Sequence, residues 1–104
     1  MHAAVTTTHG SNEDMPQLAV MAGEAMLTWI RDIEGFHGLV MLTRQATGTT
    51  HVISFWESEE IAQRHRVARM KLGERITATL NIAVQHTESY DVSFADLPEI
   101  HAPR

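Results

Sequence analysis

Histidine is the residue type with which this chain can do most chemistry, since it has seven histidines. His65 has the most informative position. Ile61, Ala68, Leu72 and Ile76 recur at helical spacing, and His65 falls inside this apolar stripe, four residues after Ile61. An imidazole on an inward stripe that borders a cavity can act as a general base near neutral pH. The alternative is a histidine at the edge of the core whose ring bonds to a backbone carbonyl.

Three further side chains extend this candidate site as substrate-binding residues. Trp56 ends a predicted strand, where its indole N–H can donate to a substrate oxygen and its ring can face His37 across a hairpin. Arg69 lies close to the stripe of His65 and can hold an anionic substrate. Trp29 is expected near the same cavity. Packing alone is the competing explanation for both tryptophans, and a solvated helix face is the competing explanation for the basic residues of 64–75.

A metal site is the second chemistry that histidines suggest. His9, His51 and His86 are expected at one end of the sheet, where a transition metal can use imidazole ligands. However, no His-x-x-x-His spacing occurs, and His86-Thr87-Glu88 matches only half of a zinc deaminase motif. The chain also has no cysteine, which excludes disulfides, thiolate nucleophiles and cysteine-bound metal clusters. We therefore predict no metal site.

The composition limits the class of protein. The chain has 104 residues, 43% of them hydrophobic, which is enough for one packed domain. Its net charge of −5 argues against binding to nucleic acid or to an anionic membrane. The first residues do not resemble a secretion signal, and no run of 18 apolar residues is present. We expect a cytoplasmic protein with no nucleic-acid or membrane partner.

Six elements must position these residues, in the order β-α-β-β-α-β. From the hydrophobic pattern and the turn residues we predict strands over 2–8, 36–44, 49–56 and 82–94, and helices over 17–34 and from Ser58 to about Leu80. Gly35 ends the first helix, 45–48 joins the central hairpin, and Ser58 caps the second helix. This order is typical of a ferredoxin-like α+β fold, a four-stranded antiparallel sheet with both helices on one face.

Both faces of the central hairpin are apolar. The face away from the helices carries either Leu39, Met41 and Val52 or, in the opposite register, Val40, Leu42 and Ile53. An apolar sheet face of this kind must be covered, and a second subunit packed sheet against sheet is the simplest cover. We therefore expect a homodimer built from a domain over 1–94, followed by a tail over 95–104 that adds no element of its own.

Two short motifs carry a family resemblance. They are Glu34-Gly35-Phe36-His37-Gly38, which opens a strand, and Phe55-Trp56-Glu57-Ser58-Glu59-Glu60, which ends a strand and begins a helix. The chain resembles the dimeric α/β barrel superfamily, in the branch of the antibiotic biosynthesis monooxygenases. The resemblance covers roughly residues 1–94 and implies two ferredoxin-like subunits that pair through their sheets.

This resemblance implies two functions. The first is cofactor-independent oxygenation of an aromatic polyketide or quinol, with His65 as the base and Trp56, Arg69 and His37 against the substrate. The second is a non-catalytic or stress-associated dimer that binds a small hydrophobic or aromatic molecule. We expect no cofactor. The haem-degrading relatives carry an Asn on the first strand and an axial His on the second helix. This chain has no Asn at residues 3–5, and the later part of its second helix has Lys71 and Arg75 in place of the axial His.

Overall fold

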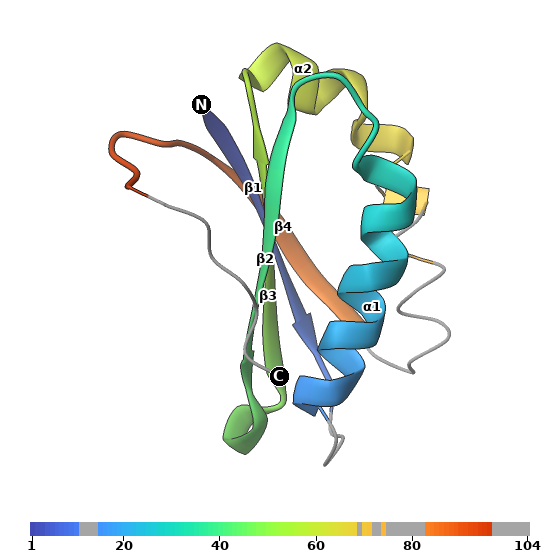
Figure 1. The fold of residues 1–104 in the computed structure, drawn as a ribbon. Coiled ribbons are helices and arrows are strands. Elements are labelled where there is room, and N and C mark those ends of the chain that lie inside the picture. Colours follow the sequence, from blue (N-terminus) through green and yellow to red (C-terminus); the bar gives the residue numbers. More distant parts are fainter. Residues whose placement is uncertain (11–14, 69, 72–73, 75–82, 97–104) are drawn as a thin grey trace.

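A computed structural model of the chain describes residues 1–10, 15–68, 70–71, 74 and 83–96 (Figure 1). Its four strands form one antiparallel sheet in the order β2-β3-β1-β4. The elements are β1 His2–His9, α1 Met15–Ile30, β2 Phe36–Arg44, the 3-10 turn η1 Gln45–Thr47, β3 Thr49–Trp56, α2 Glu59–Arg64 and β4 Ala83–Asp91. The predicted ferredoxin-like order is confirmed, and the two central strands have the predicted bounds.

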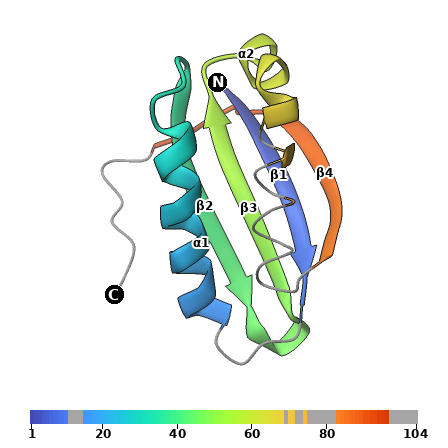
Figure 2. The ribbon, with the colours of Figure 1, turned by 90° about the vertical axis from the view of Figure 1, so that its right-hand side faces the viewer.

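Both helices lie on the same face of the sheet (Figures 1 and 2). Helix α1 packs along β2, where Gly23 lets the helix approach the Met41 sulfur. Helix α2 crosses the ends of β1 and β3. Ala22 and Ile30 of α1 and Ala62 of α2 are buried against the sheet. Within the described residues, no helix is both long enough and apolar enough to cross a membrane.

The pairing register decides which hairpin residues face the helices. Trp56 pairs with both Phe36 and His2, and its ring contacts α2, so these three side chains share the helix-facing side. Met41, which meets α1, lies on the same side. Strand alternation then places the set Val40, Leu42 and Ile53 on the opposite side, which we call the open face.

Two predicted helices differ from the observed ones. Helix α1 ends at Ile30, four residues before the predicted end, and a turn leads to Gly35, whose φ is +87°. Trp29 is 64% exposed, because it lies at the margin of the face that Ala22 and Ile30 bury. It is not among the residues that line the cleft described below. Helix α2 is interrupted at His65, whose φ of −102° and ψ of 9° differ from helical values, before helical structure resumes at Arg66.

Predicted caps and turns are confirmed at both ends of β3. The Ser58 hydroxyl accepts a hydrogen bond from the Ile61 N–H at 3.2 Å, which satisfies one free donor at the start of α2. At the other end of the strand, Gly48 has a φ of +68° and its N–H donates to the Gln45 carbonyl. The predicted end of the second helix beyond residue 74, and the tail over 97–104, lie outside the described residues. The division into a domain and a tail stays a prediction.

Candidate functional site

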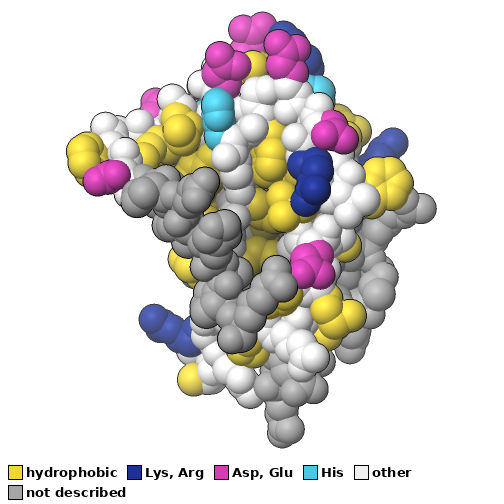
Figure 3. Space-filling view, viewed as in Figure 1, with side chains coloured by type: hydrophobic (Ala, Val, Ile, Leu, Met, Phe, Trp, Pro, Cys, Tyr) yellow, Lys and Arg dark blue, Asp and Glu magenta, His cyan; other side chains and the backbone are white. Residues whose placement is uncertain are grey.

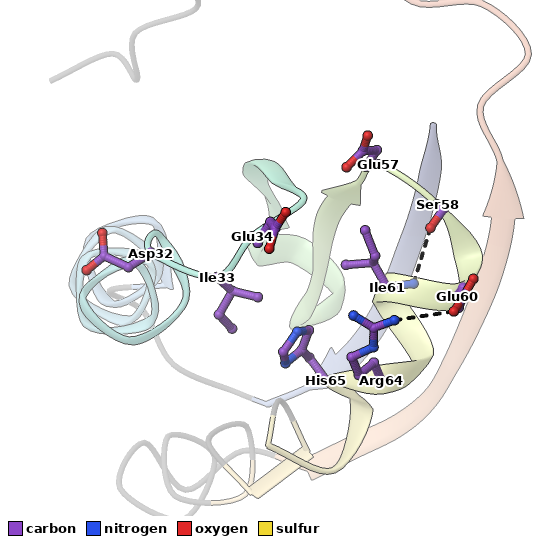
Figure 4. Close-up of a pocket in the computed structure, with 9 residues that line it drawn as sticks. All are labelled: Asp32, Ile33, Glu34, Glu57, Ser58, Glu60, Ile61, Arg64 and His65. Carbon is purple, nitrogen blue, oxygen red and sulfur yellow. Dashed lines mark hydrogen bonds and ion pairs between the residues drawn. The ribbon is translucent and has the colours of Figure 1, made fainter.

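A cleft of about 650 Å³ lies between the turn that follows α1 and the first turns of α2 (Figure 4). Its walls have two parts. The turn contributes Asp32, Ile33 and Glu34, and the β3–α2 segment contributes Glu57, Ser58, Glu60, Ile61, Arg64 and His65. At the base of this turn the Gly35 carbonyl accepts a hydrogen bond from the Glu57 N–H at 2.7 Å, which ties the turn to the start of α2. Gly35 could not carry a side chain, since a Cβ there would lie 2.8 Å from Ile61.

His65 closes α2 and lines this cleft. Its ring points toward Ile33 across the cleft (Figure 4), and its backbone N–H donates to the Ile61 carbonyl at 3.3 Å. Its other flank stacks on Trp56, with ring centroids 6.2 Å apart and an angle of 19° between the planes. The imidazole is therefore held by an aromatic surface on one side and remains part-exposed on the other. This geometry suits a base or a ligand-binding group.

Trp56 lies behind His65, is fully buried and does not itself line the cleft. Its indole N–H donates to the Ser54 hydroxyl at 2.9 Å, so this donor is already used within the protein. The ring of Phe36 meets the indole edge-on at 5.4 Å. These contacts make Trp56 a rigid wall that orients His65.

The cleft is acidic. Four carboxylates line it, from Asp32, Glu34, Glu57 and Glu60. The one arginine among the described residues that line it, Arg64, reaches Glu60 at 3.3 Å in an exposed ion pair. Acidic side chains also dominate the end of the molecule near α2 (Figure 3). Apolar contact comes from Ile33 and Ile61, so the cleft joins an apolar centre to a negatively charged rim.

The structure brings two of the four predicted site residues together, His65 and Trp56. His37 is exposed and occupies the extra position of a bulge in β2, between Phe36 and Gly38. Trp56 therefore faces Phe36, and the expected pairing of Trp56 with His37 is wrong, because the bulge shifts the register by one residue. Arg69 lies outside the described residues.

The other predicted histidine group lies on the open face. His51 and His86 pair with Thr7 from its two sides, and His9 lies two residues further along β1. His51 bonds through Nδ1 to the Thr7 hydroxyl at 3.1 Å, whereas His86 lies 3.5 Å from Glu88. Among the described residues, no three histidine or acidic side chains gather closely enough to hold a metal ion.

Sequence reasoning missed one group on the helix-facing side. His2 was interpreted only as the start of a strand, yet it is 3% exposed and lies beside Trp56. The pairing register of β1 places His2 beside Trp56 and Asp91. The sequence around residue 2 does not indicate which residues of the neighbouring strands lie next to it. The cleft carboxylates were also missed, since they come from a turn and from a helix start that the fold brings together.

A four-stranded antiparallel sheet with both described helices on one face is the ferredoxin-like fold, which solved structures of antibiotic biosynthesis monooxygenase-like proteins also have. The chain has this fold, as the two sequence motifs indicated. Neither a family model nor a curated protein sequence matches the chain. The relation is therefore visible in the three-dimensional structure.

Three solved structures illustrate the similarity. The monooxygenase ActVA-Orf6 of Streptomyces coelicolor, solved with nanaomycin D, has a TM-score of 0.66 at 19% identity, covering 94% of this chain and 92% of its own. The candidate antibiotic biosynthesis monooxygenase of Deinococcus radiodurans has a TM-score of 0.63 at 17% identity, covering 98% of this chain and 100% of its own. The haem-degrading enzyme of Listeria monocytogenes has a TM-score of 0.58 at 20% identity, covering 86% of this chain and 60% of its own.

Proposed function

We propose that this protein binds an aromatic or quinol molecule in the cleft beside His65 and oxygenates it without a cofactor. One observation carries the proposal: His65 stacks on the buried Trp56 and presents its free edge to a cleft. An imidazole held in this way can take a proton from a phenol. The similarity in fold to a monooxygenase solved with nanaomycin D supports an aromatic ligand.

The reaction uses dioxygen as its second substrate. His65 removes the acidic proton, which passes from the substrate to the imidazole. The resulting anion transfers electrons to dioxygen, a carbon–oxygen bond forms at the electron-rich carbon, and the His65 imidazolium returns its proton to the peroxide, which becomes a hydroperoxide. Loss of water from the hydroperoxide leaves one oxygen atom on the product as a carbonyl and releases the other as water. Trp56 keeps the imidazole oriented during the proton transfer.

An anthrone provides the test, because its oxidation to the quinone follows this stoichiometry. Oxygen uptake above the uncatalysed rate is expected for the wild-type protein, with a fall on the order of 10²- to 10⁴-fold in His65→Phe. His86→Phe is the matched control, since His86 is exposed on β4. Unchanged turnover in a folded His65→Phe protein would remove His65 as the base.

A second function, binding without catalysis, has one observation in its favour. Among the described residues of the cleft the one arginine, Arg64, is paired with Glu60, and four carboxylates surround the site. This environment does not stabilise a phenolate. Tight anthrone binding by calorimetry together with no oxygen uptake above background would establish the binding protein and exclude the oxygenase.

We also propose that the open face pairs with a second copy of the chain. Leu42 is 51% exposed there, and Val40, Ile53 and Phe55 continue the apolar surface across β2 and β3. The described helices all cover the opposite side. A second sheet of the same shape offers a matching apolar surface, which favours an isologous interface between two copies.

A further inference from the structure

Phe94 is the most exposed large apolar side chain of the described residues, at 87%. It belongs to the segment 92–96, which follows β4 and which we call the arm. The Val92 N–H donates to the Met1 carbonyl at 2.9 Å, so the arm first continues the ladder between β1 and β4 by one hydrogen bond. It then leaves the sheet on the side opposite the helices (Figures 1 and 2). The arm therefore projects into the space beside the open face.

The apolar side chains of the arm continue the open face. Tyr90, Val92 and Phe94 occupy alternate positions, and the residues between them are polar or small. Alternate side chains of an extended chain share one side. Tyr90 pairs with Ala3, which in turn pairs with Phe55, so this side is the open face. One apolar surface therefore runs from Phe55 across β1 to Tyr90 and out along the arm.

The apolar surface of the strands alone is small for a stable dimer, which buries about 800 Å² on each partner. The four apolar side chains of β2 and β3 are at most about half exposed, so together they offer no more than about 500 Å², since even a large aromatic side chain offers only roughly 150–250 Å². On the same scale, Phe94 and Tyr90 add roughly 200–350 Å². Only an interface that includes the arm comes close to the area of a stable dimer.

The direction of the arm favours a second copy of the chain as its partner. The arm starts at the edge strand β4 and crosses the strand ends toward the β2 edge, apart from the sheet and on its open side (Figure 2). A second sheet packed face to face on the open face lies alongside this segment. Because the arm and the open face form one apolar surface, the chain that covers the face also meets the arm. Two-fold symmetry then forms the contact twice, once with each arm.

We propose that the arm is an interface segment that clasps a second copy of the chain, with Phe94 as its apolar anchor. This inference rests on the proposed dimer, since it names a segment that holds the two copies together. Buried aromatic anchors carry a large share of the binding energy of an interface. Loss of the Phe94 ring is expected to weaken the dimer without changing the fold of each copy, because the ring contacts little of its own chain.

Sedimentation measures the contribution of Phe94. Phe94→Ser is expected to raise the dimer dissociation constant by about 10- to 100-fold, the effect of truncating an aromatic anchor. Trp29→Ser is the matched control, since Trp29 is an aromatic residue that is 64% exposed on α1, on the other side of the sheet. This control is expected to keep the wild-type dissociation constant. Circular dichroism of Phe94→Ser is expected to show the wild-type content of helix and strand.

Photocrosslinking identifies what the arm touches. The chain has no cysteine, so Phe94→Cys takes a benzophenone maleimide at this position alone. Copies grown on heavy nitrogen are mixed with unlabelled copies until the subunits have exchanged, and mass spectrometry then reads the isotopes of each crosslinked peptide pair. Pairs that join a heavy peptide to a light one are expected. The same label on Trp29→Cys is expected to give no such pairs.

The outcomes separate this inference from the proposed dimer. A wild-type dimer whose dissociation constant is unchanged in Phe94→Ser, or whose crosslinks from position 94 stay within one copy, overturns the role of the arm and leaves pairing through the open face in place. An equal rise of the constant in Phe94→Ser and Trp29→Ser overturns it as well. A wild-type monomer overturns both proposals.

Discussion

The imidazole of His65 lies nearly parallel to the indole of Trp56, with ring centroids 6.2 Å apart and an interplanar angle of 19°. The two residues come from different elements, since Trp56 ends β3 and His65 follows the last residue of α2. The stack therefore joins the helix to the sheet at the edge of the cleft. It gives His65 a fixed orientation while its free edge faces the ligand space (Figure 4).

Trp56 is expected to be the more important of the two tryptophans for stability. Its side chain is fully buried, whereas Trp29 is 64% exposed. Trp56→Ala should lower the free energy of unfolding by about 3–5 kcal/mol, because it removes a large buried side chain and leaves a cavity. Trp29→Ala should change it by about 0.5 kcal/mol or less. Urea unfolding of both variants measures the difference, and equal losses would contradict the burial of Trp56.

The hairpin turn gives a second stability prediction. Gly48 has a φ of +68°, and a Cβ there would lie 1.9 Å from the Gly10 carbonyl oxygen. Gly48→Ala should therefore cost more than about 1–2 kcal/mol, the penalty of the left-handed conformation alone. Gly38→Ala is the control, because its Cβ would meet only Phe55, at 4.0 Å. Thermal unfolding should show a clear loss for the first variant and little change for the second.

Sedimentation at micromolar concentration tests the proposed dimer. Leu42→Asp places a charge in the apolar part of the open face formed by β2 and β3, and it should raise the dimer dissociation constant by a factor on the order of 10² or more, because an unpaired buried charge costs about 3–5 kcal/mol. Met21→Asp is the matched control. Met21 is also exposed, at 59%, but it lies on α1, so this variant should remain dimeric. A stable wild-type monomer would exclude pairing through the sheet.

Tyr90 gives a prediction about pH, and it is the only tyrosine in the chain. Its hydroxyl donates to the Glu88 carboxylate, which raises the pKa of Tyr90 above 10.0, since the hydrogen bond and the nearby negative charge both favour the neutral phenol. The hydrogen bond therefore stabilises the folded protein at pH values below the ordinary pKa of tyrosine. This stabilisation is lost as the pH rises through the raised pKa of Tyr90 in the folded protein.

Tyrosinate absorbance reports this residue without interference from another tyrosine. Glu88→Gln should lower the pKa of Tyr90 toward its ordinary value, because it removes the negative charge. Glu24→Gln is the control, because Glu24 is exposed on α1, which packs along β2 at the other edge of the sheet from β4, and it should leave the titration curve in place. Identical curves for the wild-type protein and Glu88→Gln would contradict the hydrogen bond.

The sequence alone determined the features that depend on neighbouring residues. Turn residues and alternating apolar positions placed β2, β3 and the cap at Ser58 correctly, since strand periodicity, a glycine with positive φ and an N-cap are local properties. The helical spacing also placed His65 on the inward side of the second helix. These predictions need no knowledge of distant contacts.

Only the tertiary structure decided which residues meet. A single extra residue at His37 shifted the hairpin register, so that Trp56 faces Phe36, and the pairing of β1 with β3 brought His2 beside Trp56. The packing of α1 on Met41 likewise decides which side of the hairpin faces the helices. Such relationships depend on a register in which a shift of one residue exchanges the two faces of a strand, and no local pattern specifies that shift.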